Sequence, residues 1–170
     1  MTTERTAVLS PDGVYRFELR RHVADVEGAT VCWVMLNPST ADATVDDPTI
    51  RRCIRFTRDW GYSDLIVVNV WPYRATSPEA LKRWLRSMPP VPGAVFGNES
   101  YIERAAAEAD LVIAAWGSHA DEARAEAVLE TLQRAQVDGE VHVLGFTQYG
   151  APRHPLYMTV TTQPEMWVRS

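Results

Sequence analysis

Four apolar segments of strand length end in polar or turn residues that could do chemistry. The first ends at Asn37 and the second at Asn69. The third ends in the turn Gly117-Ser118, and the fourth runs on into a loop that holds His154. An amide offers donors and an acceptor in one plane, and a neutral imidazole offers one donor and one acceptor. If these groups face one crevice, the sequence predicts a site that binds a heterocycle.

The elements around these residues predict how they are brought together. Strand patterns alternate with helical patterns, which predicts a three-layer α/β/α sandwich with a central four-stranded parallel sheet. Ligands bind such sheets outside the carboxyl ends of the strands, so the four polar endings are expected to line one site. The strand patterns cover residues 30–36, 64–69, 111–116 and 141–145, and the helical patterns cover residues 48–60, 78–87, 98–109 and 119–135.

Turn residues predict two further features of the chain. The turn at residues 11–13, Pro-Asp-Gly, separates the strand-like runs 6–10 and 14–20 and predicts a β-hairpin ahead of the sheet. Residues 89–93 contain three prolines and a glycine, which predicts an irregular connector.

Length and composition limit the class of protein. A chain of 170 residues fits a single domain, residues 1–170, and its two cysteines, Cys32 and Cys53, form no CxxC motif. No histidine pair has metal-ligand spacing, so neither a metal nor a cofactor is expected. The chain starts without a signal pattern and lacks the ~18 consecutive apolar residues of a membrane span, which predicts a soluble, cytoplasmic protein without membrane contact. A monomer is expected, and the net charge of −5 argues against broad binding of polyanions.

The two asparagines allow a structural and a functional interpretation. Asn37 precedes Pro38, and such a pair often only forms a turn. Asn69 follows four apolar residues and comes shortly before Trp71, so its amide is expected at the edge of an aromatic-walled pocket. There it could read the hydrogen-bonding edge of a base. The alternative is that Asn69 only caps the junction of strand and loop.

His154 lies between Arg153 and Pro155 in a loop that holds too many turn residues for a helix or a strand interior. A loop histidine is often an ordinary surface residue. Its place after the fourth strand and its rigid, proline-flanked backbone instead favour a preorganised electrophile at the site.

The helix predicted over residues 48–60 carries arginines at helical spacing. Arg51, Arg55 and Arg58 fall on one face, and a carboxylate from residues 46–47 is expected to cap the helix. Such a charged face is often only solvated. The amino end of this helix is expected to point toward the crevice, however, where its dipole and the arginines would attract a phosphate.

These motifs resemble, in order, those of the uracil-DNA glycosylase superfamily. Residues 35–39 are similar to the first motif of its mismatch-specific branch, and residues 65–69 are similar to the strand whose terminal Asn reads a flipped base. Residues 115–118 resemble the family's Trp-Gly-Ser strand end. Residues 154–156 resemble the His-Pro motif whose histidine stabilises the departing base. The resemblance covers residues 30–157.

A closer resemblance involves residues 36–42, 46–52 and 60–62, which are similar to a bacterial and phage family known as domain of unknown function 1643. The superfamily resemblance implies a uracil-DNA glycosylase-like fold. It also implies a DNA glycosylase-like hydrolase, active in base-excision DNA repair, that cleaves the N-glycosidic bond of a damaged or modified base flipped into the pocket. Its partner would be nucleic acid, with DNA favoured.

The resemblance assigns roles to the candidate residues. His154 would be a neutral donor to the departing base, and Asn69 would read that base. Asn37 would place the attacking water, helped by Asp46 or Asp47, because an amide accepts no proton at neutral pH. The other expected base contacts are Leu36, Pro38 and Trp71. The residues expected to contact nucleic acid or phosphate are Ser39, Arg51, Arg55, Arg58, Gly117, Ser118, Arg153 and Leu156.

Two other classes of function remain open. An enzyme acting on a free nucleoside or nucleotide would use the same pocket without a nucleic-acid groove, and the net charge of −5 favours this class. A non-catalytic module that binds modified nucleic acid would keep Asn69 and the basic helix, and it would tolerate an amide at residue 37.

Overall fold

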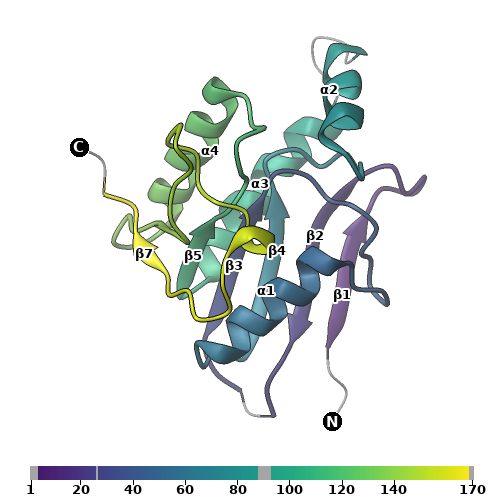
Figure 1. The fold of residues 1–170 in the computed structure, drawn as a ribbon. Helices are drawn as coiled ribbons and strands as arrows, with labels where there is room; N and C mark the ends of the chain where they lie inside the picture. Colours follow the sequence, from purple (N-terminus) through teal and green to yellow (C-terminus); the bar gives the residue numbers. More distant parts are fainter. Residues whose placement is uncertain (1–3, 26, 88–92, 169–170) are drawn as a thin grey trace.

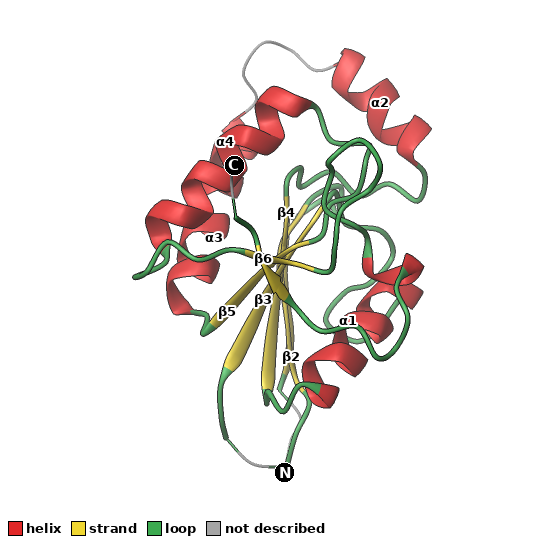
Figure 2. Ribbon diagram, turned by 60° about the vertical axis from the view of Figure 1, so that its left-hand side comes forward, coloured by secondary structure: helices red, strands yellow, loops and turns green. Residues whose placement is uncertain are grey.

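The chain forms one seven-stranded mixed sheet with helices on both of its faces (Figure 1, Figure 2). The computed structural model describes residues 4–25, 27–87 and 93–168. The strands are β1 (Arg5–Leu9), β2 (Arg16–His22), β3 (Thr30–Met35), β4 (Asp64–Asn69), β5 (Leu111–Ala114), β6 (His142–Val143) and β7 (Glu165–Met166). The helices are α1 (Pro48–Asp59), α2 (Pro78–Ser87), α3 (Gly93–Glu108) and α4 (Glu122–Ala135), and a 3₁₀ turn, η1 (Pro155–Tyr157), follows β6.

The strand order in the sheet is β1-β2-β4-β3-β5-β6-β7. The four strands expected to pair in parallel do so, in the order β4, β3, β5 and β6. The predicted extent of the sheet is wrong, because β2 continues it antiparallel to β4 and β7 continues it antiparallel to β6. The predicted hairpin of β1 and β2 therefore covers an edge of β4 that would otherwise leave backbone groups unpaired. The predicted fourth strand is also too long, since β6 has only two residues.

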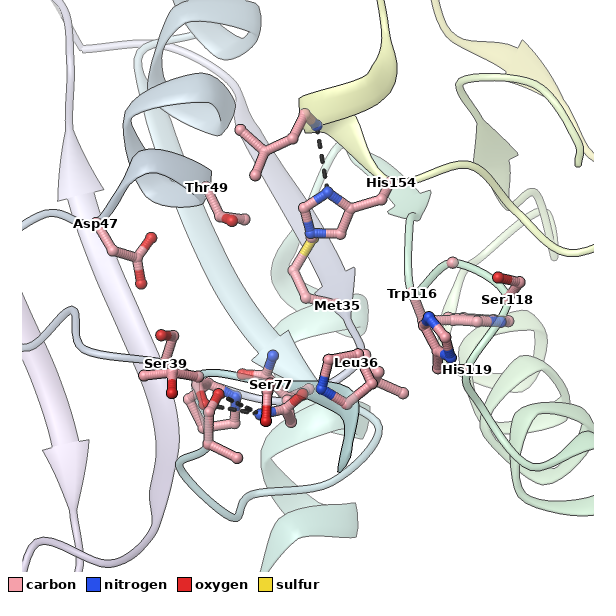
Figure 3. Close-up of a pocket in the computed structure, with 18 of the residues that line it drawn as sticks. Met35, Leu36, Ser39, Asp47, Thr49, Ser77, Trp116, Ser118, His119 and His154 are labelled. Carbon is pink, nitrogen blue, oxygen red and sulfur yellow. Dashed lines mark hydrogen bonds between the residues drawn. The ribbon is translucent and has the colours of Figure 1, made fainter. Parts of the chain in front are cut away.

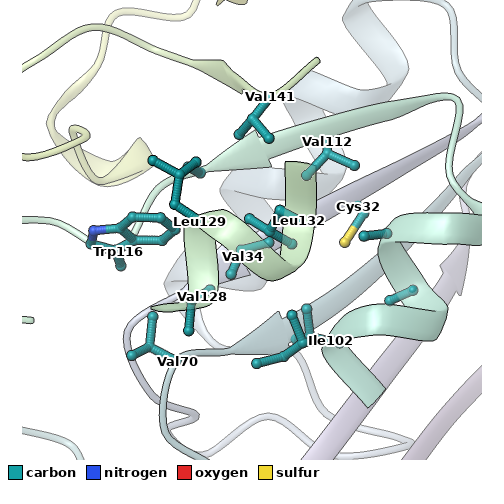
Figure 4. Packing of buried hydrophobic residues seen from close by; sticks show 14 of the residues in the cluster. Cys32, Val34, Val70, Ile102, Val112, Trp116, Val128, Leu129, Leu132 and Val141 are labelled. Atoms are coloured by element: carbon teal, nitrogen blue, oxygen red, sulfur yellow. The ribbon is translucent and has the colours of Figure 1, made fainter. Parts of the chain in front are cut away.

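Strand β3 is buried on both faces, which explains its unbroken apolar sequence. Its residues Trp33 and Met35 pack in a cluster with α1, whereas Cys32 and Val34 pack in a second cluster with α3 and α4. Figure 2 shows α1 on one side of the sheet and α3 and α4 on the other. Figure 4 shows the second cluster, in which Val34 lies among side chains of both helices. The sheet is thereby held between two apolar layers, and its strand ends are fixed in place.

The boundaries of α1 follow the predicted signals. Asp47 is the N-cap, and its side chain accepts a hydrogen bond from the backbone N–H of Ile50. Pro48 occupies the first turn, and Gly61 follows the helix with a φ of +84°. Both signals lie in local sequence, so they were readable without tertiary information.

Helix α2 has the predicted bounds, whereas α3 and α4 depart from theirs. Helix α2 begins as predicted, with the Ser77 hydroxyl accepting from the N–H of Ala80. Helix α3 begins at Gly93, earlier than predicted, and α4 begins later, after its N-cap Asp121. Of the predicted connector, residues 89–92 lie outside the described residues. Within residues 4–25, 27–87 and 93–168, no helix combines the length and the apolar character needed to cross a membrane.

Candidate functional site

A cavity of about 730 Å³ lies at the carboxyl ends of β3 and β4, beside the amino end of α1. The predicted site residues that line it are Leu36, Asn37, Pro38, Ser39, Asp47, Asn69, Gly117, Ser118, Arg153, His154 and Leu156. In Figure 3, Asp47 and Thr49 from the start of α1, His154, and Ser118 and His119 from the loop after β5 surround the same space. The four strand endings line one cavity, as predicted.

Backbone hydrogen bonds beyond the strands hold the walls of the cavity together. The N–H of Val70 donates to the carbonyl of Met35 at 2.8 Å, which continues the pairing of β3 and β4 past their ends. The N–H of Gly117 donates to the carbonyl of Pro152 at 2.9 Å, which brings the loop of His154 against the end of β5. Gly117 has a φ of +74°, a backbone conformation that residues with a Cβ rarely adopt.

His154 is held as a neutral imidazole. It is the N-cap of η1, and its Nδ1 accepts a hydrogen bond of 3.2 Å from the backbone N–H of Leu156. Burial lowers the pKa of His154 to about 4, and the carboxylate of Asp47 opposes this shift only in part. Because Nδ1 accepts, the proton of the neutral ring lies on Nε2, so His154 offers a hydrogen-bond donor.

Asn69 is 1% exposed and has one side of its amide free. Its Oδ1 accepts from Arg16 Nη2 at 3.4 Å, and its backbone carbonyl accepts from the amide of Asn98, in α3, at 2.8 Å. Its Nδ2 has no hydrogen-bond partner among the described residues. A buried amide N–H group without a partner costs stability, and this one belongs to a residue that lines the cavity.

Arg16 is a site residue that the sequence did not predict. It lies at the start of β2, lines the cavity and is 2% exposed. Its Nη1 donates to the carbonyl of Ala41 at 3.0 Å, and burial lowers its pKa to about 10, against the opposing effect of Asp47. The sequence predicted the hairpin but gave no signal that β2 pairs with β4, and this pairing is what brings Arg16 beside Asn69.

The two aspartates before α1 have different roles. Asp47 is 7% exposed and lines the cavity. Among the described residues that line the cavity, it is the only one with a carboxylate. Asp46 does not line the cavity, which corrects its predicted catalytic role. Its carboxylate instead forms ion pairs of 2.9 Å with Arg5 and with Arg21, and these tie the loop before α1 to the hairpin.

Asn37 lines the cavity, but its donor is used by the backbone. Its Nδ2 donates to the carbonyls of Pro38 and Ala75, both at 2.9 Å, and to that of Tyr73 at 3.4 Å. These bonds pin the loop after β4 to the loop after β3. Only Oδ1 is left to orient a water, because it has no hydrogen-bond partner among the described residues.

Trp71 does not line the cavity, so the prediction that it contacts a base there is wrong. Its ring lies under the guanidinium of Arg124 at 5.0 Å and edge-on to Trp84 at 6.2 Å, against the cluster of α3 and α4. The tryptophan that does line the cavity is Trp116, which is 3% exposed.

The arginine face of α1 does not reach the cavity either. The helix buries Ile50 and Phe56 against the sheet, so the basic positions point away from it. Their polar groups are used locally: Arg51 Nη1 donates to the carbonyl of Asp46, Arg55 pairs with Asp59, and Arg58 Nε donates to the carbonyl of Val23. The predicted phosphate contact by Arg51, Arg55 and Arg58 is therefore not part of the cavity.

The described part of the chain holds no group of three or more His, Cys, Asp or Glu side chains that could hold a metal ion.

A family model described as "Protein of unknown function (DUF1643)" matches residues 16–156. No curated protein and no solved structure matches the chain.

Proposed function

Because the chain belongs to the DUF1643 family, whose description assigns no activity, we propose a function from the cavity: an N-glycosyl hydrolase that releases a damaged or modified base. The base would enter the cavity from nucleic acid, after flipping out of its stack. A uracil-DNA glycosylase-like fold is part of this proposal, and it is supported by the parallel strands and by the order of their polar ends.

One observation supports the proposal above the others. Asn69 and His154 come from elements 85 positions apart in the sequence, yet both line one cavity and both offer a buried or largely buried hydrogen-bond donor. A heterocycle held between them would meet two preorganised donors. Such donors act mainly where negative charge develops, which in N-glycosidic cleavage is the departing base.

The residues present suit hydrolysis with little covalent chemistry from the protein. As the bond between the sugar carbon C1′ and the base nitrogen breaks, its electron pair passes to the base. His154 Nε2–H then donates to the base and stabilises its charge, and Asn69 Nδ2 holds the edge of the ring. A water attacks C1′ and loses its proton toward Asp47, while Asn37 Oδ1 orients that water. Gly117, Ser118 and Arg153 line the same cavity and would hold a phosphate of the substrate.

The test is release of a base under single-turnover conditions. Duplexes and single strands that carry a panel of modified bases are incubated with the protein, and alkali then reveals abasic sites. His154→Ala is expected to lower the rate on the best substrate by about 10²–10³ with little change in binding, since this donor matters most in the transition state. The matched control is His22→Ala, because His22 pairs with Asp64 at the far end of the sheet.

A free nucleoside or nucleotide is the second candidate substrate. The α1 arginines lie outside the cavity, so Arg16 and Arg153 are its only basic lining residues besides the histidines in the described chain. Nucleoside hydrolysis followed by chromatography tests this candidate. If no substrate of either kind loses a base, but one binds tightly and needs Asn69, the hydrolase proposal is overturned and a binding module is supported.

A further inference from the structure

Arg16 is a buried cation that the proposed chemistry does not use. It forms no ion pair among the described residues, although its side chain is 2% exposed. Arg21, in the same strand and equally exposed, has the carboxylate of Asp46 at 2.9 Å. A buried charge is expensive unless it is paired, so Arg21 is explained by folding. Arg16 lacks such an explanation.

The main opposite charge that acts on Arg16 is that of Asp47, and each oxygen of Asp47 already accepts one backbone hydrogen bond. Its Oδ1 accepts from the N–H of Ile50 at 2.9 Å, and its Oδ2 accepts from the N–H of Ala41 at 3.3 Å. Asp47 therefore offsets the charge of Arg16 without binding it. The guanidinium Nε is left with no hydrogen-bond partner among the described residues.

Arg16 also fixes the orientation of the Asn69 amide. Asn69 Oδ1 faces Arg16 Nη2 at 3.4 Å, and a flipped amide would place two donors against each other. The oxygen side of the amide is therefore turned to the arginine, and the Nδ2 side is the one left for a ligand.

Two buried side-chain atoms of the described lining residues lack a hydrogen-bond partner, and both are donors. Arg16 Nε and Asn69 Nδ2 are the buried polar side-chain atoms without a partner among the described lining residues, and His154 Nε2–H adds a further donor. Donors and a buried positive charge together favour a ligand edge of acceptors, and above all a negatively charged one. A doubly charged phosphate fits less well, because Asp47 lines the same cavity.

We propose that Arg16 is a specificity-determining residue that makes the cavity select a heterocyclic base through an edge of acceptors, preferring the anion of a base that has lost its ring N–H proton. This rests on the proposed function in that the ligand is the base of the substrate. A neutral uracil-type edge carries an N–H between two carbonyls, and this N–H would meet donors. Loss of its proton turns the nitrogen into an acceptor and adds charge, whereas cytosine has an acceptor at that nitrogen without charge.

The experiment is calorimetric titration of the whole protein with three free bases in one weakly alkaline buffer. Uracil stays neutral there, 6-azauracil has nearly the same shape but is ionised, and cytosine supplies the neutral acceptor. Wild type is expected to bind 6-azauracil at least about tenfold more tightly than uracil, because hydrogen bonds to charged groups are the stronger ones. Arg16→Met is expected to lose this preference. Arg134→Met, which removes one exposed charge of α4 outside the cavity, should retain it.

Arg16→Lys keeps the inference testable if Arg16→Met fails to fold, because it retains the charge and most of the volume. It is expected to keep part of the preference for 6-azauracil. Cytosine that binds more tightly than uracil shows that the acceptor edge itself is read, and cytosine that binds like uracil shows that charge is selected; either result supports the proposal.

Three results would overturn it. These are equal binding of uracil and 6-azauracil by wild type, binding of neither base, and competition by inorganic phosphate as strong as that by 6-azauracil. No bond is cleaved in these titrations. The preference for 6-azauracil over uracil can therefore be present in a protein that releases no base, and it can be absent in a protein that does release one. Failure here is thus distinguishable from failure of the hydrolase proposal.

Discussion

The neutral state of His154 makes the stability of the protein depend on pH in a defined window. Its pKa is lowered from 6.5 to about 4 by burial. Between these values the unfolded chain binds the proton and the folded protein does not. The free energy of unfolding therefore rises with pH through this window. The part of it that depends on the neutral His154 is fully present above pH 6.5 and is lost as the pH falls toward 4.

The size of the effect follows from the two pKa values. One pKa unit corresponds to about 1.4 kcal/mol, so the full loss of stability below both pKa values is roughly 3.5 kcal/mol. At about pH 4.5 most of it, about 2.5 kcal/mol, is already lost relative to about pH 7. This is a large part of the stability of a typical small domain.

The assay compares wild type with His154→Asn by urea unfolding at about pH 7 and about pH 4.5. Asparagine keeps an acceptor near the N–H of Leu156 but carries no titrating group, so wild type is expected to lose about 2.5 kcal/mol more than the variant on acidification. His22, whose pKa is raised by its hydrogen bond with Asp64, is present in both proteins and cancels. Equal losses in the two proteins, or an NMR titration of His154 at or above its ordinary pKa, would refute the argument.

Two further predictions follow from packing and charge. Leu132→Ala is expected to lower the free energy of unfolding by about 2–5 kcal/mol, because Leu132 is fully buried between α4 and the sheet. Leu156→Ala, at a position that is 44% exposed, should change it far less. Urea unfolding of both variants measures the difference. If the protein binds single-stranded DNA, Arg153→Ala is expected to reduce the slope of log binding constant against log salt by about one, because Arg153 is exposed and lines the cavity. Arg55→Ala, at a residue paired with Asp59, should leave the slope unchanged, and the reverse pattern would place the contact on α1.

Elements encoded by local sequence were predictable. The unbroken apolar runs predicted β3, β4 and β5, and the cap at Asp47 predicted the start of α1. The strand ends then predicted most of the cavity, because parallel strands present their carboxyl ends to the same edge. No tertiary information was needed for these steps.

Trp71 shows where regular alternation along a strand ceases to apply. Val67 packs with the α1 cluster and Val68 with the α3 and α4 cluster, so strict alternation would place Trp71 on the same side as Val67. Trp71 packs on the other side, because β4 ends at Asn69 and the chain turns there. The point where alternation ends depends on the tertiary contacts of the loop after β4, and the sequence of the strand does not encode it.

The arginines of α1 illustrate a different error. Their common face was correctly predicted, and the apolar positions Ile50, Cys53 and Phe56 on the opposite side already indicated which face the helix buries. The amino end of the helix does reach the cavity, through Asp47 and Thr49. The dipole argument located the end of the helix, but it did not carry over to side chains one to three turns further along.

Arg16 could not be predicted from local sequence, because its environment depends on pairing between strands that are far apart along the chain. The hairpin signal fixed β1 and β2 relative to each other, while the antiparallel pairing of β2 with β4 decided which side chain meets Asn69. A buried guanidinium without an ion pair and a histidine kept neutral in acid both lower the stability of the fold. Local features that work against folding tend to be retained where a ligand compensates for them. That both occur in one cavity, on elements whose positions are set independently, is the strongest physical reason to place the function of this protein there.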